Sequence, residues 1–186
     1  KNLSVQYKTM RSTVCALNGV SFSIERGRAI GLVGEAGAGK TTTALSILNL
    51  LPEDIGSVTE GDILYNGKSV LKMSQRELLK IRGSRISMIF QNPLTSLNPV
   101  FTVGEQIAMV LRKHMGMGRK EANERAKELL ETVGIPSYRL NDYPNQFSGG
   151  MRQRVGIAAG LACNPELLIA DEPTTALDVT IQAQIL

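Results

Sequence analysis

Hydrophobic and polar residues alternate in two segments of the N-terminal third, which is typical of half-buried strands. LSVQY (3–7) and VSFSI (20–24) both show this alternation, so the sequence predicts a strand over each. RGRAIGLVG (26–34) is apolar through its centre and predicts a short buried strand that leads into a glycine-rich loop. After the loop, KTTTALSILNLL (40–51) predicts a helix that ends at Pro52.

Two local motifs follow in the next thirty residues. DILYNGKSVL (62–71) predicts a hairpin, because its Asn-Gly pair at 66–67 suits a two-residue turn with positive φ angles. SQRELLKIRG (74–83) predicts a short helix that begins with a capping box between Ser74 and Glu77.

The pattern then changes to helical and returns to a strand near the end. RISMIFQ (85–91) predicts a strand and LLIADEP (167–173) predicts a buried strand, and the residues between them have mainly helical periodicity. A helical segment between strands predicts an α/β core with an inserted helical subdomain. We expect a core of residues 1–91 and 159–186 and a helical subdomain of residues 92–158.

Composition excludes several classes of function. The 186 residues include 21 Lys and Arg and 17 Asp and Glu, a net charge of +4 with no long basic run, so nucleic-acid binding is not expected. Cys15 and Cys163 are far apart and predict buried thiols in a reducing compartment. No apolar run is long enough to span a bilayer, so a membrane role needs a partner. The chain begins without Met and ends in mid-pattern, and we expect it to be a fragment.

The loop GEAGAGKT (34–41) fits the phosphate-binding pattern G-x-x-x-x-G-K-[ST] between a predicted strand and a predicted helix. Its backbone N–H groups would form an anion nest, Lys40 would reach the β and γ phosphates, and the Thr41 hydroxyl would hold Mg²⁺. The predicted nucleotide ligands are Gly34, Glu35, Ala36, Gly37, Ala38, Gly39, Lys40, Thr41 and Thr42.

Two carboxylates, Asp171 and Glu172, follow the predicted strand at its carboxyl end, where open α/β sheets bind ligands. Successive side chains of a strand point to different sides, so Asp171 suits a Mg²⁺ shell and Glu172 suits a water in line with the γ-phosphate. A GTPase or a small-molecule kinase can share the loop and the Asp, but neither requires the Glu, and no N-K-x-D motif is present.

FSGGMRQRV (147–155) predicts a second anion site at a helix start, where small residues leave backbone N–H groups accessible. The predicted contacts come from Ser148, Gly149 and Gly150. A simple helix cap by Ser148 is the alternative, and the two roles are compatible.

The phosphate loop, Gln91, SGGMRQR (148–154), LLIADEP (167–173) and TTALD (174–178), in this order, resemble ATP-binding cassette (ABC) ATPases over essentially the whole chain. The resemblance implies a P-loop NTPase (RecA-like) core with an antiparallel β subdomain and an inserted helical subdomain. It also implies Mg²⁺-dependent ATP hydrolysis by two subunits packed head to tail, where the Ser-Gly-Gly of one contacts the ATP in the phosphate loop of the other.

The same resemblance assigns roles to single residues. Glu172 would align and deprotonate the attacking water, with Lys40 and Gln91 as the other catalytic residues. Gln91 would also approach Mg²⁺ beside Thr41 and Asp171, although a capping amide is the plainer alternative. Asp178 would couple the two ATP sites, and Tyr7 would stack on adenine, unless it is simply a strand residue.

FQNPLTSLNPVFTVGEQI (90–107) and DEPTTALDVTIQAQI (171–185) are similar to the ATPase subunits of dipeptide and oligopeptide importers, a group that includes nickel importers. This similarity implies a membrane permease, a second ATPase subunit, an extracellular solute-binding protein and a place on the cytoplasmic face of the cell membrane. A soluble ABC ATPase without a permease and a binding module without hydrolysis are the alternatives.

The family's switch histidine would lie beyond residue 186, and His114 cannot replace it because it precedes SGGMRQR (148–154). We therefore expect the chain by itself to bind ATP with weak or absent turnover. Asn92, Phe147 and Met151 also depart from the usual family residues, but none of these changes removes a phosphate ligand.

Overall fold

A computed structural model describes residues 1–92 and 96–173 of the chain. The contacts within the chain divide it into two compact units, Lys1–Leu79 and Lys80–Leu186, which are described separately below. This boundary differs from the predicted core and helical subdomain, whose bounds stay a prediction. TTALD, with Asp178, lies outside the described residues.

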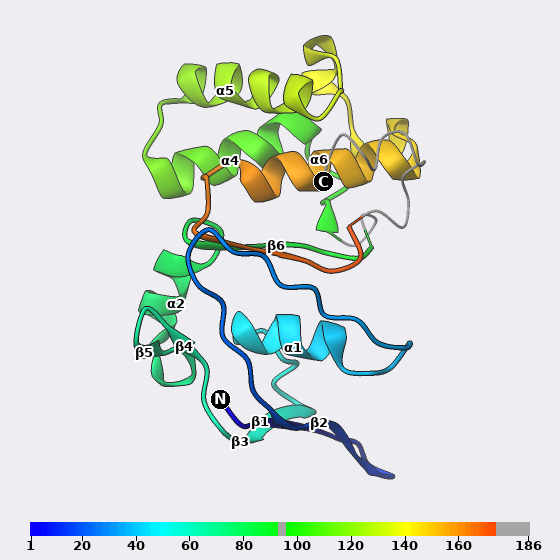
Figure 1. Ribbon diagram of the computed structural model, residues 1–186. Helices are drawn as coiled ribbons and strands as arrows, with labels where there is room; N and C mark the ends of the chain where they lie inside the picture. The colour runs from blue at the N-terminus through cyan, green and yellow to red at the C-terminus, as the bar shows by residue number, and fades with distance from the viewer. Residues whose placement is uncertain (93–95, 174–186) are drawn as a thin grey trace. The chain divides into compact units, whose positions relative to one another are not determined.

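The first unit contains a three-stranded antiparallel sheet in the order β2-β1-β3 (Figure 1). β1 (Leu3–Lys8) pairs with β2 (Thr13–Val20) on one side and with β3 (Gly56–Glu60) on the other. Leu3, Val5 and Leu17 form the buried apolar cluster of this sheet. The prediction of a strand over 3–7 is confirmed, and so is the antiparallel β subdomain.

Two of the predicted strands are wrong. Residues 21–24 are irregular, because the partner of β1 is the preceding segment Thr13–Val20. The segment 26–34 is irregular too, and its Ile30, Leu32 and Val33 are exposed. An apolar run shows only that a segment can be buried. Within residues 1–92 and 96–173, no other segment supplies the hydrogen-bonded ladder that would make 26–34 a strand.

The helix after the phosphate loop, α1 (Lys40–Ile47), ends four residues before the predicted end. Asn49 takes a left-handed conformation with φ 51°, and the backbone N–H of Leu50 donates to the carbonyl of Leu45 at 2.9 Å. This is the hydrogen bond of a helix C-terminal cap, in which Asn substitutes for the more usual Gly.

The two local motifs fold as the sequence predicts. The hairpin consists of β4 (Leu64–Tyr65) and β5 (Lys68–Ser69), and positive φ angles of 47° and 78° at Asn66 and Gly67 form its turn. A 3₁₀ helix, η1 (Val70–Lys72), leads to α2 (Gln75–Ile81), which runs across the boundary between the units. In the capping box of α2, the Ser74 N–H donates to Glu77 Oε2 at 2.8 Å, and the Glu77 N–H donates to Ser74 Oγ at 3.4 Å.

The second unit joins a parallel strand pair to helices (Figure 1). β6 (Ile86–Ile89) and β7 (Leu167–Ala170) pair in register from Ile86 with Leu167 to Ile89 with Ala170. Three helices, α4 (Val103–Met115), α5 (Arg119–Thr132) and α6 (Gly149–Leu161), contact one another, and two short 3₁₀ helices, η2 (Ser137–Asn141) and η3 (Pro144–Gln146), connect α5 to α6.

One apolar core lies between these helices and the strand β6. Its fully buried members come from each helix and include Val103, Ile107, Leu111, Ala122, Ala126, Leu130 and Val155. Ala122, Ala126, Leu129 and Leu130 form the face of α5 that packs in this core, and Val133 continues that face. This core supports the first turn of α6, where the Ser-Gly-Gly triplet lies.

Candidate functional site

The phosphate loop is closed on itself by its own lysine. The Lys40 ammonium group donates to the carbonyl oxygens of Gly34 at 2.7 Å and Glu35 at 2.9 Å. Lys40 is also the first residue of α1, so its amine and the positive end of the helix dipole lie at the same loop. A bound phosphate would replace these carbonyls as the partner of the amine.

Gly39 is the residue before α1, and the chain leaves no room for a side chain there. Its φ is 84°, and a Cβ atom would lie 2.6 Å from the carbonyl oxygen of Ala16 and 2.6 Å from the side chain of Leu17. The glycine therefore satisfies two requirements: a left-handed backbone and close packing of the loop on β2.

Two predicted nucleotide ligands follow at the start of α1. Thr41 is exposed, so its hydroxyl is accessible at the first turn. Thr42 Oγ1 lies 3.4 Å from the Tyr7 hydroxyl, which places this tyrosine of β1 beside the helix of the phosphate loop. The stacking of Tyr7 on adenine stays a prediction.

The two carboxylates after β7 have different surroundings. The N–H of Asp171 donates to the carbonyl of Ile89 at 3.0 Å, which extends the β6–β7 ladder, and Asp171 is buried. Glu172 is exposed and has a φ of 48°, in the left-handed region. A side chain other than Gly in this region costs about 1–2 kcal/mol, and such strain is concentrated at functional sites.

Gln91, which follows β6, contacts the second of these carboxylates. Its Nε2 atom donates to Glu172 Oε2 at 2.8 Å, although 81 residues separate the two in the chain. The parallel pairing of β6 and β7 brings their carboxyl ends to one edge of the sheet, which explains why the two side chains meet.

The Ser-Gly-Gly triplet begins α6, as the sequence predicts. Ser148 is the N-cap, and its Oγ accepts from the Met151 N–H at 3.3 Å. A Cβ atom added at Gly149 would meet no atom within 4 Å, so the helix start is open on that side. We refer to residues 148–150 as the signature turn.

The family now follows from comparison with known proteins. The sequence pattern of the ABC transporter family matches residues 17–175. The chain belongs to this family. Among curated relatives, it is 53% identical to "Probable peptide ABC transporter ATP-binding protein y4tR" of Sinorhizobium fredii, covering 100% of the chain and 56% of the relative. It is 52% identical to "Oligopeptide transport ATP-binding protein OppD" of Bacillus subtilis, covering 100% of the chain and 52% of the relative.

A solved structure of the same class confirms the predicted fold. The chain superposes with a TM-score of 0.89, at 34% identity, on the ATP-binding cassette MJ0796 in a dimeric post-hydrolysis state bound to ADP and Pi, covering 100% of the chain and 78% of that structure. The P-loop ABC fold is thus confirmed. The chain spans about half the length of the curated relatives above.

The ABC chain distributes its candidate residues over both units. The phosphate loop and Tyr7 belong to the first unit, and the Gln91–Glu172 pair, Asp171 and the signature turn belong to the second. Among the described residues, no helix is long and apolar enough to cross a membrane, and no group of three or more His, Cys, Asp or Glu side chains could hold a metal.

The donor types nevertheless fit Mg²⁺. This ion prefers oxygen ligands, and it commonly keeps several waters and substrate phosphates with only one or two protein groups. The exposed Thr41 hydroxyl, the Asp171 carboxylate and the amide oxygen of Gln91 are all oxygen donors of this kind.

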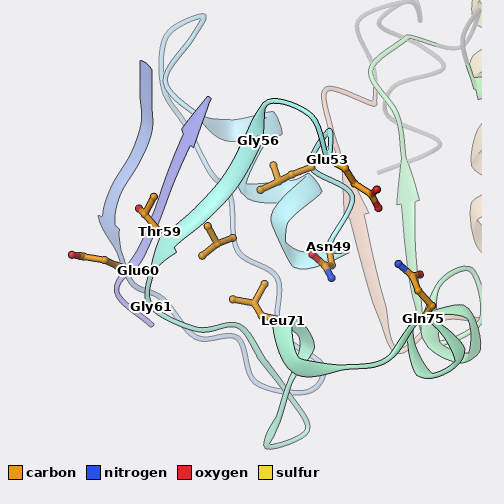
Figure 2. Close-up of a pocket in the computed structure, with 10 residues that line it drawn as sticks. Asn49, Glu53, Gly56, Thr59, Glu60, Gly61, Leu71 and Gln75 are labelled. Atoms are coloured by element: carbon orange, nitrogen blue, oxygen red, sulfur yellow. The ribbon is translucent and has the colours of Figure 1, made fainter. Parts of the chain in front are cut away.

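A hollow of about 490 Å³ in the first unit contains none of these residues. It lies beside β3, and Figure 2 shows Asn49, Glu53 and Gln75 with polar groups around it. Its lining has no member of the phosphate loop, so it is separate from the predicted nucleotide ligands.

Arg139 lies outside every motif that the sequence pattern predicts. It lies in η2, eight residues before Phe147, and its guanidinium carbon is 4.2 Å from the centre of the Phe147 ring. The two positions lie in no common helix or strand, so periodicity does not predict their contact. Only the folded structure shows the contact.

Proposed function

We propose that this chain is part of the ATP-binding and ATP-hydrolysing subunit of an ABC importer that takes up dipeptides or oligopeptides. The observation that carries the proposal is the Gln91–Glu172 contact at the ends of two paired strands, in a chain that also has a complete phosphate loop and an open signature turn. The names of the relatives, which are peptide transport ATP-binding proteins, support the substrate class.

In this proposal, the phosphate loop of one subunit binds ATP. The loop N–H groups and Lys40 hold the β and γ phosphates, and Tyr7 stacks on adenine. Thr41, Gln91 and Asp171 would hold Mg²⁺, which would neutralise phosphate charge. Asp178, outside the described residues, couples the two sites.

Hydrolysis needs a water that is aligned with the γ-phosphorus. Glu172 accepts a proton from this water as its oxygen bonds to the phosphorus, and the bond from the γ-phosphorus to the bridging oxygen breaks, giving ADP and phosphate. Gln91 holds the Glu172 carboxylate by the hydrogen bond at 2.8 Å and so orients the base.

The signature turn completes the site of a second subunit. Its open N-terminal N–H groups and the helix dipole of α6 suit the γ-phosphate of an ATP that the other subunit binds. The second subunit is either a second copy or a related ATPase, and the pair drives an integral membrane permease at the cytoplasmic face, fed by an extracellular solute-binding protein.

Two experiments on the full-length protein test this proposal. Affinity capture after mild detergent extraction should recover a permease, and the reconstituted complex should import peptides in an ATP-dependent manner. Import of nickel instead would select the nickel branch, and recovery without any membrane protein would favour a soluble ABC ATPase.

The second experiment tests Glu172. General-base catalysis contributes about 10²–10⁴-fold, so we expect Glu172→Gln to lower the kcat for ATP by about this factor while ATP still binds. An unchanged turnover rate would contradict the role of Glu172 as the base.

A further inference from the structure

We infer that Arg139 is a positioning residue for the ATPase reaction, because it holds the signature turn from both sides. The inference rests on the proposed function, in which this turn contacts the γ-phosphate bound by a second subunit. Arg139 itself touches no predicted ATP ligand among the described residues.

Arg139 contacts the chain directly before the signature turn. Its Nη2 group donates to the carbonyl of Gln146 at 3.0 Å, and its guanidinium lies over the buried ring of Phe147 at 4.2 Å. A cation at this distance from an aromatic face is attracted to the ring, and arginine can stack its plane there as well.

The same side chain also contacts the chain directly after the turn. Its Nη1 group lies 3.5 Å from the Met151 sulfur. Met151 is also the residue whose N–H donates to Ser148 Oγ in the helix cap. One guanidinium therefore connects the residues on both sides of the turn, and it fixes the direction in which the N–H groups of α6 point.

The ion pair with Asp142 indicates that Arg139 supports the signature turn and does not bind phosphate. The Arg139 Nε group donates to Asp142 Oδ2 at 2.8 Å, and the side chains are only 22% and 30% exposed. The Asp142 carboxylate neutralises the guanidinium charge. The two terminal nitrogens of the guanidinium contact Gln146 and Met151, and its planar face lies over Phe147.

A lysine cannot reproduce this arrangement. Its ammonium group carries the same charge, but it has no planar fork to donate in three fixed directions while it stacks on a ring. Arg139→Lys is therefore a test of geometry at constant charge. Arg112→Lys is the matched control, because Arg112 also forms a half-buried ion pair in the second unit, with Glu105 on α4, a helix that does not contain the signature turn.

The test uses the full-length protein in its complex with the permease and the second ATPase subunit. We expect Arg139→Lys to lower the kcat per assembled complex by about 5–30-fold, equivalent to about 1–2 kcal/mol, and Arg112→Lys to leave it within twofold of the parent. The Kd of the isolated subunit for ATP should not change, because the phosphate loop is intact.

The outcomes separate three accounts. A purely structural role would lower the melting temperature and the yield of complex but leave the kcat per assembled complex unchanged, which would overturn the inference. An equal kcat in the two lysine variants would overturn it as well. If the parent complex shows no ATP turnover, or a turnover that Glu172→Gln does not abolish, the proposed function fails, and the inference fails with it.

Discussion

The side chains of Gln91 and Glu172 form a hydrogen bond with each other, although the two residues follow different strands. The amide donates to a carboxylate oxygen of an exposed side chain, so it limits the rotamers of Glu172 without burying it. The role of catalytic base that we propose for Glu172 needs this combination of accessibility and fixed direction.

We expect Gln91→Ala to lower the kcat for ATP by about 10-fold or more, because the carboxylate loses its orienting donor while its charge remains. ATP affinity should change much less. Steady-state kinetics of the full-length complex measures both, with Glu172→Gln as the reference for complete loss of the base. A Gln91→Ala variant with the parent kcat would show that the contact does not orient the base.

His114 gives a pH dependence to the stability of the second unit. Burial lowers its pKa below the ordinary value of 6.5, and the charge of Lys113 lowers it further. The imidazole lies at the end of α4, where a Cβ atom on Gly83 would come within 3.2 Å of its Nε2 atom.

The unfolded chain binds a proton at His114 more readily than the folded chain does. The free energy of unfolding should therefore fall as the pH decreases below about 6.5, and this contribution should be constant above that pH. Urea unfolding between pH 5 and 7.5 tests this, and His114→Gln should remove part of the decrease. The same slope in both proteins would contradict the role of His114.

The helices α4, α5 and α6 form the element that carries the signature turn, and their contacts are mainly apolar. Leu130 of α5 is fully buried in this core, whereas Leu79 of α2 is 52% exposed. The two residues are thus a matched pair of leucines in different surroundings.

Leu130→Ala should lower the free energy of unfolding by about 2–5 kcal/mol, because it removes buried methyl groups and leaves a cavity. Leu79→Ala should change it by less than about 1 kcal/mol. Denaturant unfolding of the two variants measures the difference, and equal losses would mean that the core does not depend on α5 in this way.

Elements with local signals were predictable from sequence. The Asn66-Gly67 turn, the Ser74–Glu77 capping box and the start of α1 at the phosphate loop depend on residues close together in the chain. The two strands that end near Gln91 and Glu172 were also predictable, because both have continuous apolar runs. β6 is buried, whereas the prediction that β7 is buried is wrong, because its residues are half-buried or exposed.

Elements defined by distant partners were not predictable in the same way. Residues 13–20, and not 20–24, form β2, because they are the segment that pairs with β1. The other partner of β1 is β3, which lies some fifty residues further along the chain. The contact of Arg139 with Phe147 and Met151 was missed for the same reason. Sequence periodicity shows which face of a segment is apolar, but not which neighbour it will meet.

At the scale of the whole molecule, the reaction that we propose uses two chains. The phosphate loop has its own lysine and a threonine hydroxyl, whereas the signature turn presents N–H groups at an open helix start. The cassette MJ0796, similar over the full chain, is dimeric in the solved structures. Two ATP molecules between two such subunits would use every one of these groups.

The most direct measurement is the ATP-dependent association of the full-length ATPase subunits. In the Glu172→Gln background, which keeps bound ATP from being consumed, sedimentation at saturating Mg-ATP should show a dimer, either of this subunit or with its related ATPase. Ser148→Arg, which places a bulky side chain at the signature turn, should return the sample to monomers without loss of ATP binding. Monomers at saturating Mg-ATP in the Glu172→Gln protein, alone and mixed with the second ATPase subunit, would contradict the account.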